Sequence, residues 1–236
     1  MGIVVEFAHE LRLFLPSRHR DGPVETAVDG TSSLGHVIES LGVPLPEVGT
    51  LLLEGDPVAP SHRPTGGEHV TVLAVSRPQP TPSPPRFLLD VHLGTLARRL
   101  RLVGVDAAYD NDLDDDTLID MANAQRRILL TQDRGILRRR KLWFGAFVRG
   151  GRPEEQFDDL LDRFAPPLHP WTRCTACNGL LAPVAKAEIE HRLEPGTRRC
   201  HDEFARCQTC DRLYWKGAHR ERLQAIVDDA RRMRHA

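Results

Sequence analysis

Two cysteine pairs, each with the spacing C-x-x-C, constrain the fold of this chain more than any other feature. The pairs are Cys174 with Cys177 and Cys207 with Cys210. Two thiolates at this spacing hold one edge of a zinc tetrahedron, and a second pair about 30 residues later completes it. The spacing therefore predicts a zinc ribbon. Four thiolates leave no open coordination position, so the zinc is expected to be structural. Cys200 has no such partner and is predicted to be a free thiol.

Composition and charge exclude several classes of protein. The 236 residues carry a net charge of -1 at pH 7, so a nucleic-acid surface would have to be a local patch. No apolar run approaches the length of a membrane span, and the N-terminal residues lack the pattern of a signal peptide. Cysteines in metal-type pairs favour a reducing compartment. We therefore expect a cytoplasmic protein with no membrane partner.

A proline-rich segment divides the chain. Residues 76–85 contain five prolines and cannot form a helix or a central strand, so they are predicted to be a stiff, extended linker. A softer boundary is expected just before the first cysteine pair. The predicted parts are residues 1–75, the linker, residues 86–165 and residues 166–236.

The first part has the pattern of a small α+β module. Strand-like runs at Ile3–Phe7 and Val24–Val28 precede a segment in which Leu34, Val37, Ile38 and Leu41 share one helical face. Two later apolar runs complete the order strand, strand, helix, strand, strand. This order predicts a β-grasp, ubiquitin-like module.

This module resembles the small sulfur-carrier branch of the β-grasp fold, whose members end in a free Gly-Gly. Here the pair Gly66-Gly67 is followed by a further strand and by the linker. A carrier function is therefore disfavoured, and a docking or stabilising role is favoured. A docking role implies a protein partner for this module.

Residues 86–165 alternate between strand and helix patterns, which predicts an α/β domain with a parallel sheet flanked by helices. Sites in such sheets form at the carboxyl ends of the strands. Asp90 directly follows the run Phe87-Leu88-Leu89, and Asp133 follows the run that starts at Ile128. A third acid is expected from the pair Asp115 and Asp116, which opens the second helix.

Three carboxylates at one sheet edge are tolerable when a divalent cation lies between them, because like charges otherwise repel. Mg²⁺ prefers oxygen ligands, and a cation held in this way promotes phosphodiester hydrolysis. The pattern leaves an alternative open. Asp114 or Asp115 can cap the second helix, and Asp133 can cap the helix predicted over Ile136–Lys141.

Four stretches of this part together resemble a known family: Phe87–Arg101, Gly104–Asp106, Tyr109–Asp112 and Arg127–Arg134. They resemble the PIN-like ribonuclease domain named for the C-terminal part of the Mut-seven exonuclease. That family commonly carries an N-terminal ubiquitin-like module and a C-terminal zinc ribbon, so the resemblance covers nearly the whole chain.

The resemblance implies a metal-dependent ribonuclease that hydrolyses RNA, in which Asp90, Asp115 and Asp133 hold Mg²⁺ or Mn²⁺. Asp116 is the rival of Asp115. Many PIN domains have a fourth acid, but the stretch after Asp133 offers none nearby. The alternative is therefore a non-catalytic RNA-binding or adaptor protein that retains the fold.

Basic residues near the predicted site suggest phosphate contacts, which give affinity without sequence specificity. Arg98 and Arg101 are expected on the exposed side of the first helix, and Arg134 and Arg138 follow Asp133. Arg98, Arg134 and Arg138 are the predicted RNA contacts. The alternative for these residues is a solvated helix face.

Overall fold

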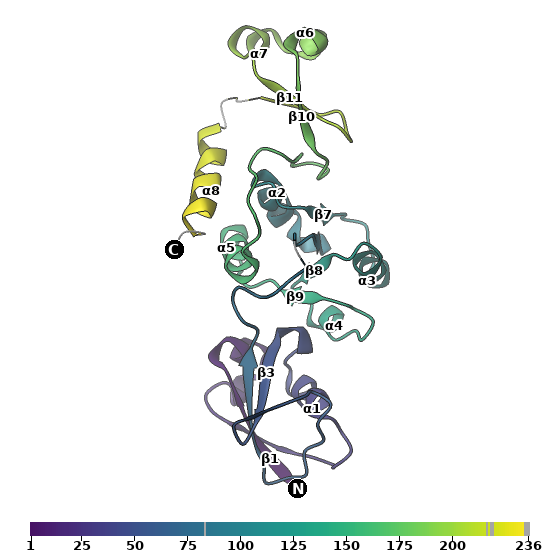
Figure 1. The fold of residues 1–236 in the computed structure, drawn as a ribbon, viewed down its shortest axis with the longest axis vertical. Helices are drawn as coiled ribbons and strands as arrows, with labels where there is room; N and C mark the ends of the chain where they lie inside the picture. The colour runs from purple at the N-terminus through teal and green to yellow at the C-terminus, as the bar shows by residue number, and fades with distance from the viewer. Residues whose placement is uncertain (83, 216, 218–219, 234–236) are drawn as a thin grey trace. The chain divides into compact units, whose positions relative to one another are not determined.

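The computed structural model describes residues 1–82, 84–215, 217 and 220–233 (Figure 1). The chain forms two compact units, Met1–Gln79 with Thr131–Phe147 and Pro80–Leu130 with Val148–Ala236. Within the described residues, no helix is both long enough and apolar enough to cross a membrane.

The first unit contains a five-stranded mixed sheet with the order β2-β1-β5-β3-β4. β1 pairs in parallel with β5 and antiparallel with β2, while β3 pairs antiparallel with β4 and β5. The strands are β1 (Gly2–Phe7), β2 (Val24–Ala27), β3 (Val48–Leu53), β4 (Asp56–Val58) and β5 (His69–Ala74). This arrangement confirms the predicted α+β module.

One α-helix and three 3-10 helices accompany this sheet: α1 (Leu34–Leu41), η1 (His9–Phe14), η2 (Ser17–His19) and η3 (Leu45–Glu47). α1 begins after Ser33, whose hydroxyl accepts a hydrogen bond from the backbone of His36, and it ends at Gly42 with φ of 119°. The buried face of α1 and the apolar face of the sheet form one core, which includes Phe14 of η1. Phe147, far along the chain, packs against the same core.

The central sheet has the order β7-β6-β8-β9. β6 lies between β7 and β8 and pairs in parallel with both, so that Leu89 is opposite Tyr109 on one side and Leu130 on the other. All residues of β6 and β8 are buried, as expected for strands covered on both faces. The strands are β6 (Phe87–Leu89), β7 (Ala107–Tyr109), β8 (Ile128–Thr131) and β9 (Gly145–Phe147).

The helices that follow these strands are η4 (Val91–Leu93), α2 (Gly94–Leu102), α3 (Asp115–Ala124), α4 (Arg134–Leu137) and α5 (Pro153–Phe164). They flank the parallel sheet, and the predicted α/β class is confirmed. α4 is shorter than predicted and starts earlier, because the side chain of Asp133 caps it by accepting a hydrogen bond from Gly135.

The C-terminal part contains a three-stranded antiparallel sheet with the order β10-β11-β12. Its strands are β10 (Leu181–Val184), β11 (Phe204–Cys207) and β12 (Leu213–Trp215), with α6 (Lys186–Ile189), η5 (Glu190–Arg192) and α7 (Pro195–Cys200) between the first two. α8 (Arg220–Met233) packs against α2 and α5.

Candidate functional site: aspartates at the sheet edge and a four-cysteine cluster

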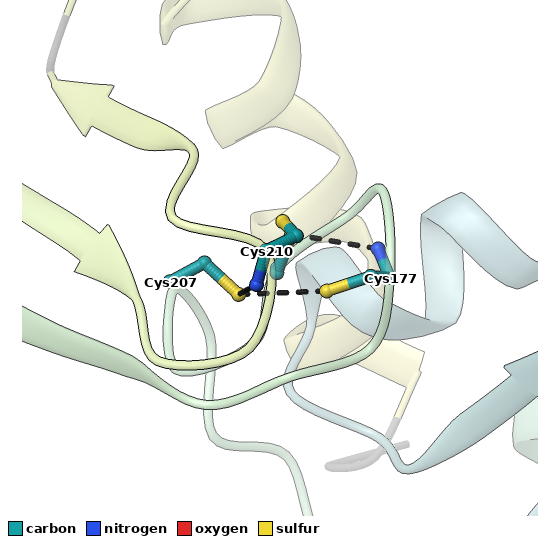
Figure 2. A group of neighbouring side chains, drawn as sticks. Cys177, Cys207 and Cys210 are labelled. Atoms are coloured by element: carbon teal, nitrogen blue, oxygen red, sulfur yellow. Dashed lines mark hydrogen bonds between the residues drawn. The ribbon is translucent and has the colours of Figure 1, made fainter.

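The four predicted zinc ligands come together. All four sulfur atoms lie within 4.8 Å of one another, with 3.6 Å between those of Cys174 and Cys210. The sulfur atoms of Cys177 and Cys207 are 3.4 Å apart (Figure 2). Sulfur atoms bound to one tetrahedral zinc at about 2.3 Å are separated by about 3.8 Å, so the cluster fits this ion. Backbone N–H groups of Cys177 and Cys210 donate to the sulfurs of Cys174 and Cys207 at 3.4 Å. Such bonds stabilise thiolate ligands.

The surroundings of the cluster lower the pKa of one thiol and raise the pKa of another. Burial opposes ionisation of Cys174, but hydrogen bonds from the Tyr214 hydroxyl and the Cys177 backbone outweigh it and lower the pKa of Cys174 to about 6. Burial raises the pKa of Cys177 to about 12. A divalent cation would supply the charge that allows all four thiolates to coexist. Cys200 is exposed and lies outside the cluster.

The loop between the first two cysteines is bonded to the central sheet through Arg101. This guanidinium is 3% exposed and donates to the carbonyl of Ala107 at 2.7 Å. It also donates to the carbonyls of Thr175 and Ala176 at 3.2 and 2.8 Å. The prediction that Arg101 lies on the exposed side of its helix is therefore wrong, because these three carbonyls bind it on the buried side.

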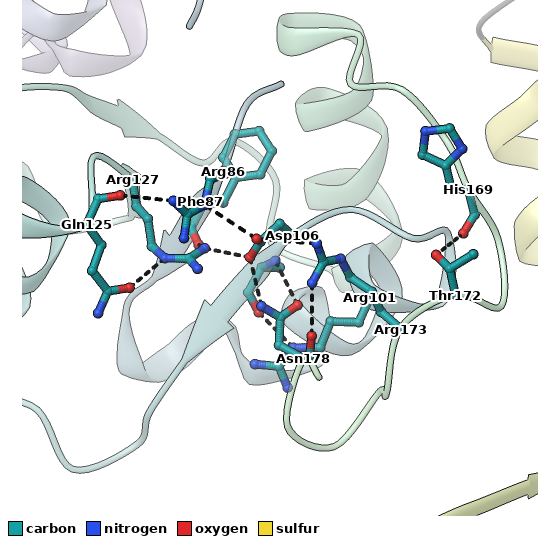
Figure 3. A network of polar contacts seen from close by, with 11 residues as sticks. Arg86, Phe87, Arg101, Asp106, Gln125, Arg127, His169, Thr172, Arg173 and Asn178 are labelled. Atoms are coloured by element: carbon teal, nitrogen blue, oxygen red, sulfur yellow. Dashed lines mark hydrogen bonds and ion pairs between the residues drawn. The ribbon is translucent and has the colours of Figure 1, made fainter. Parts of the chain in front are cut away.

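Asp106, at the start of β7, is the centre of a network of charges. Its carboxylate accepts hydrogen bonds from Arg127 at 2.6 Å and from the amide of Asn178 at 2.8 Å, and Arg86 and Arg173 lie 3.4 Å away (Figure 3). Burial alone would raise the pKa of Asp106, but the bonds from Arg127 and Asn178 and the neighbouring positive charges hold it below its usual value. The network is therefore built for an ionised carboxylate.

Asp90 lies at the carboxyl end of β6, as predicted. It is 8% exposed, and its backbone N–H donates to the carbonyl of Leu130 at 3.0 Å, which extends the pairing of β6 with β8 by one residue. Its carboxylate accepts a hydrogen bond from the backbone of Val91 at 2.6 Å. The hydroxyl of Tyr109 donates to the carbonyl of Val91, so the end of β7 is tied to the same turn.

This turn needs a glycine at position 94. A Cβ atom there would lie 2.9 Å from the ring of Tyr109, closer than side chains approach one another. Gly94 therefore allows the ring to pack on the start of α2 and hold the turn that follows Asp90.

Asp115 and Asp116 open α3 and are exposed. The capping role belongs to Asp114, whose carboxylate accepts a hydrogen bond from the backbone of Thr117 at 2.8 Å. Since the cap is supplied by their neighbour, the first turn of α3 presents two further carboxylates to solvent.

Asp133 is exposed and follows β8 by one intervening residue. Its Oδ1 atom accepts a hydrogen bond from Gly135 at 2.5 Å, so the capping alternative describes its contact here. Its own N–H donates to the hydroxyl of Thr131 at 2.8 Å. A carboxylate has about four lone-pair sites on two oxygens, so a cap does not prevent it from binding a cation as well.

Among the residues that the structure describes, the four cysteines are the only group of three or more Cys, His, Asp or Glu side chains gathered at metal-binding distance. Asp90, Asp115 and Asp133 do not form such a group here. Their joint metal site remains a prediction.

The chain also matches known families. The family described as Mut7-C RNAse domain matches residues 85–227, which is more than half of the chain. This chain belongs to the Mut7-C RNase family. The family described as Mut7-C ubiquitin matches residues 1–80. No curated protein and no solved structure matches the chain.

The three predicted RNA contacts of this Mut7-C protein have different surroundings. Arg98 on α2 and Arg138 after α4 are exposed. Arg134 is half-buried, and its guanidinium donates to the carbonyls of Leu13 and Phe14 at 2.9 Å each. Arg98 and Arg138 are thus open to solvent, whereas Arg134 is bound to two backbone carbonyls.

Sequence reasoning missed the polar network around Asp106. One signal was present, because the charged residue Asp106 lies between apolar residues, directly before the half-buried strand β7. The identity of its partners had no local signal, since Asn178 is 72 residues away.

Proposed function

We propose that this Mut7-C protein is a ribonuclease that hydrolyses phosphodiester bonds of single-stranded RNA and depends on Mg²⁺ or Mn²⁺. The observation that carries the proposal is the position of Asp90. It is a nearly buried carboxylate at the carboxyl end of β6, an inner strand of the parallel sheet, and it is held there by the backbone of β8 and by the turn that Tyr109 anchors. This edge is where open α/β sheets bind ligands.

In this proposal Asp90, Asp115 and Asp133 bind the cation, and Asp116 is the alternative to Asp115. Carboxylate oxygens are the ligands that Mg²⁺ and Mn²⁺ prefer, so the donor set fits these ions. The bound cation would supply a Lewis acid that polarises the phosphodiester and activates water. Arg98 and Arg138 hold the phosphate backbone by charge, which orients the RNA without selecting its sequence.

The test is cleavage of a labelled single-stranded RNA by the full chain with Mg²⁺ or Mn²⁺. We expect EDTA to abolish cutting and Asp90→Asn to reduce it at least about 100-fold, because an amide keeps the bond to Val91 but loses the charge that holds the cation. Asp120→Asn, at an exposed position of α3, is the matched control and should cut normally. Metal-dependent cutting that survives in Asp90→Asn would refute the proposal.

A second candidate is a non-catalytic RNA-binding or adaptor protein. It is favoured by one observation, that the stretch after Asp133 has no further Asp or Glu before Glu154. In the same assay, this candidate predicts RNA binding by wild-type protein without cutting, whatever divalent ion is added.

A further inference from the structure

The turn that carries Asp133 is built into the same compact unit as the N-terminal module. This unit joins Met1–Gln79 to Thr131–Phe147, a segment that begins at the end of β8 and ends with β9. Two sets of contacts hold the segment on the module. They lie near its two ends and meet at one side chain, Phe14.

The first contact is made by Arg134. Its Nη1 donates to the carbonyl of Phe14 and its Nη2 to the carbonyl of Leu13, both at 2.9 Å. These are the last residues of η1, where the helix itself leaves carbonyls without a partner. The guanidinium carbon also lies 5.1 Å from the centre of the Phe14 ring. A planar fork that spans two carbonyls and stacks on a ring is a geometry that lysine does not reproduce.

The second contact is made by Phe147. Its ring meets that of Phe14 edge-to-face, with centroids 5.0 Å apart and an angle of 80°. Its backbone N–H donates to Oε1 of Glu47 at 2.8 Å, and Glu47 is fully buried. Both ends of the segment are therefore fixed to η1 and η3 of the module.

Asp133 and Arg134 are consecutive, and the backbone around them is closed on itself. The N–H of Asp133 binds the hydroxyl of Thr131, and the carboxylate of Asp133 binds the N–H of Gly135. Arg134 is therefore bound to the module directly beside the turn that holds the carboxylate of Asp133.

We propose that the N-terminal ubiquitin-like module is a positioning element for Asp133, and that Arg134 is the positioning residue through which it acts. This inference rests on the proposed function, in which Asp133 is a cation ligand. Arg134 then belongs to the protein scaffold and not to the RNA surface. Residues that orient a metal ligand typically change metal affinity about 10- to 100-fold when they are lost.

The test compares Arg134→Gln with Arg18→Gln in the full chain. Arg18 is an exposed arginine of η2 in the same module, and its guanidinium contacts only its neighbour His19 among the bonds described for it. Both variants lose one positive charge, so they share any general effect on RNA attraction. Hydrogen exchange of residues 131–147 is measured in metal-free protein, Mn²⁺ binding by calorimetry, and RNA binding in EDTA.

We expect Arg134→Gln to accelerate exchange in residues 131–147 about tenfold and to weaken Mn²⁺ binding about tenfold or more, with RNA affinity in EDTA equal to that of Arg18→Gln. Arg18→Gln should match wild type in exchange and in Mn²⁺ affinity. Arg134→Lys keeps the charge and one hydrogen bond, so it should weaken Mn²⁺ binding about threefold. If Arg134→Gln does not fold, Arg134→Lys still tests the inference.

Wild-type exchange and wild-type Mn²⁺ affinity in Arg134→Gln would overturn the inference. Weaker RNA binding in EDTA with no change in exchange would also overturn it, because Arg134 would then be an RNA ligand. Failure of the proposed function looks different. In that case Asp90→Asn does not reduce the binding of Mn²⁺ below that of wild-type protein, and the inference fails together with the proposed function.

Discussion

Two arginines attach distant segments of this chain in the same way but in different surroundings. In the first unit, Arg134 donates to the carbonyls of Leu13 and Phe14. In the second, Arg101 donates to the carbonyls of Thr175 and Ala176. In each case one planar guanidinium binds two consecutive carbonyls of a segment that lies far away in the sequence.

The surroundings separate the two attachments. Arg101 is 3% exposed and lies beside the charged network of Asp106, and the loop it binds runs between Cys174 and Cys177. Arg134 is half-buried and lies on the ring of Phe14, with Phe147 on the same ring. The C-terminal attachment therefore lies among charged groups and next to the cysteine cluster, whereas the N-terminal one lies among aromatic rings.

The largest effect is expected from the zinc site. Structural zinc contributes about 10 kcal/mol or more to the folding of small metal-dependent domains. Cys174→Ser should reduce the zinc content from about one ion per chain and disorder β10, β11 and β12. It should also accelerate hydrogen exchange at Ala107, whose N–H donates to the side chain of Asn178, the residue after the first cysteine pair. Metal analysis and hydrogen exchange measure these effects.

Cys200→Ser is the matched control for this experiment, because Cys200 is exposed and outside the cluster. It should keep its zinc and the exchange pattern of wild type. The sheet of the N-terminal module should be unaffected in both variants. Faster exchange in β1 to β5 of Cys174→Ser would contradict the distinction between the two attachments. A wild-type protein that folds well without zinc would show that the fold does not need the metal.

A smaller effect is expected from Asp106→Asn. The substitution leaves Arg127, which is only 8% exposed at its side chain, and Arg173 without the anion that they face. Breaking a buried ion pair from one side costs about 3 to 5 kcal/mol, and we expect about 3 because the carboxylate of Asp106 is 17% exposed. Urea unfolding at pH 7, followed by a signal from the C-terminal unit, measures the loss.

The pH dependence of this loss follows from the lowered pKa of Asp106. A carboxyl whose pKa is lower in the folded state contributes stability above its unfolded pKa of about 3.9, and this contribution disappears as the pH falls through the folded value. The difference in unfolding free energy between wild type and Asp106→Asn should therefore be constant from about pH 7 to pH 5 and should shrink below about pH 4. A difference that stays constant into acid would show that the ionised form is not what stabilises the network.

The elements of this fold were largely predictable from local pattern. β6 is an apolar run and β8 begins with one at Ile128–Leu130, and the spacing of the cysteine pairs indicated the ribbon directly. The placement of Asp90 also followed from pattern, because an acid that ends a buried strand of a parallel sheet must lie at its carboxyl edge.

The roles of other residues were not predictable, for physical reasons that differ. Asp133 suits a helix cap and a cation equally well, and sequence alone does not separate these roles. Arg134 has its partner 120 residues away, so no local pattern identifies it. For Arg101 a signal was present, since it lies four residues after Ala97 on a helical face that is buried. The charge of Arg101 led to the wrong prediction of an exposed side chain, because an arginine is usually exposed unless it is paired inside the protein.

The smallest effect is expected at the N-terminal attachment, from Phe147→Leu. Leucine keeps most of the apolar contact with the module core but loses the edge-to-face contact with Phe14, which is worth about 0.5 to 1.5 kcal/mol. We expect a loss of about 1 kcal/mol in the unfolding free energy of the N-terminal unit.

Because no titrating group takes part in this contact, the loss should be the same at pH 7 and pH 4 and should not change with salt. This behaviour is the opposite of that expected for Asp106→Asn. A loss at Phe147 that disappears in acid would contradict this interpretation, because the contact between the two rings does not depend on pH.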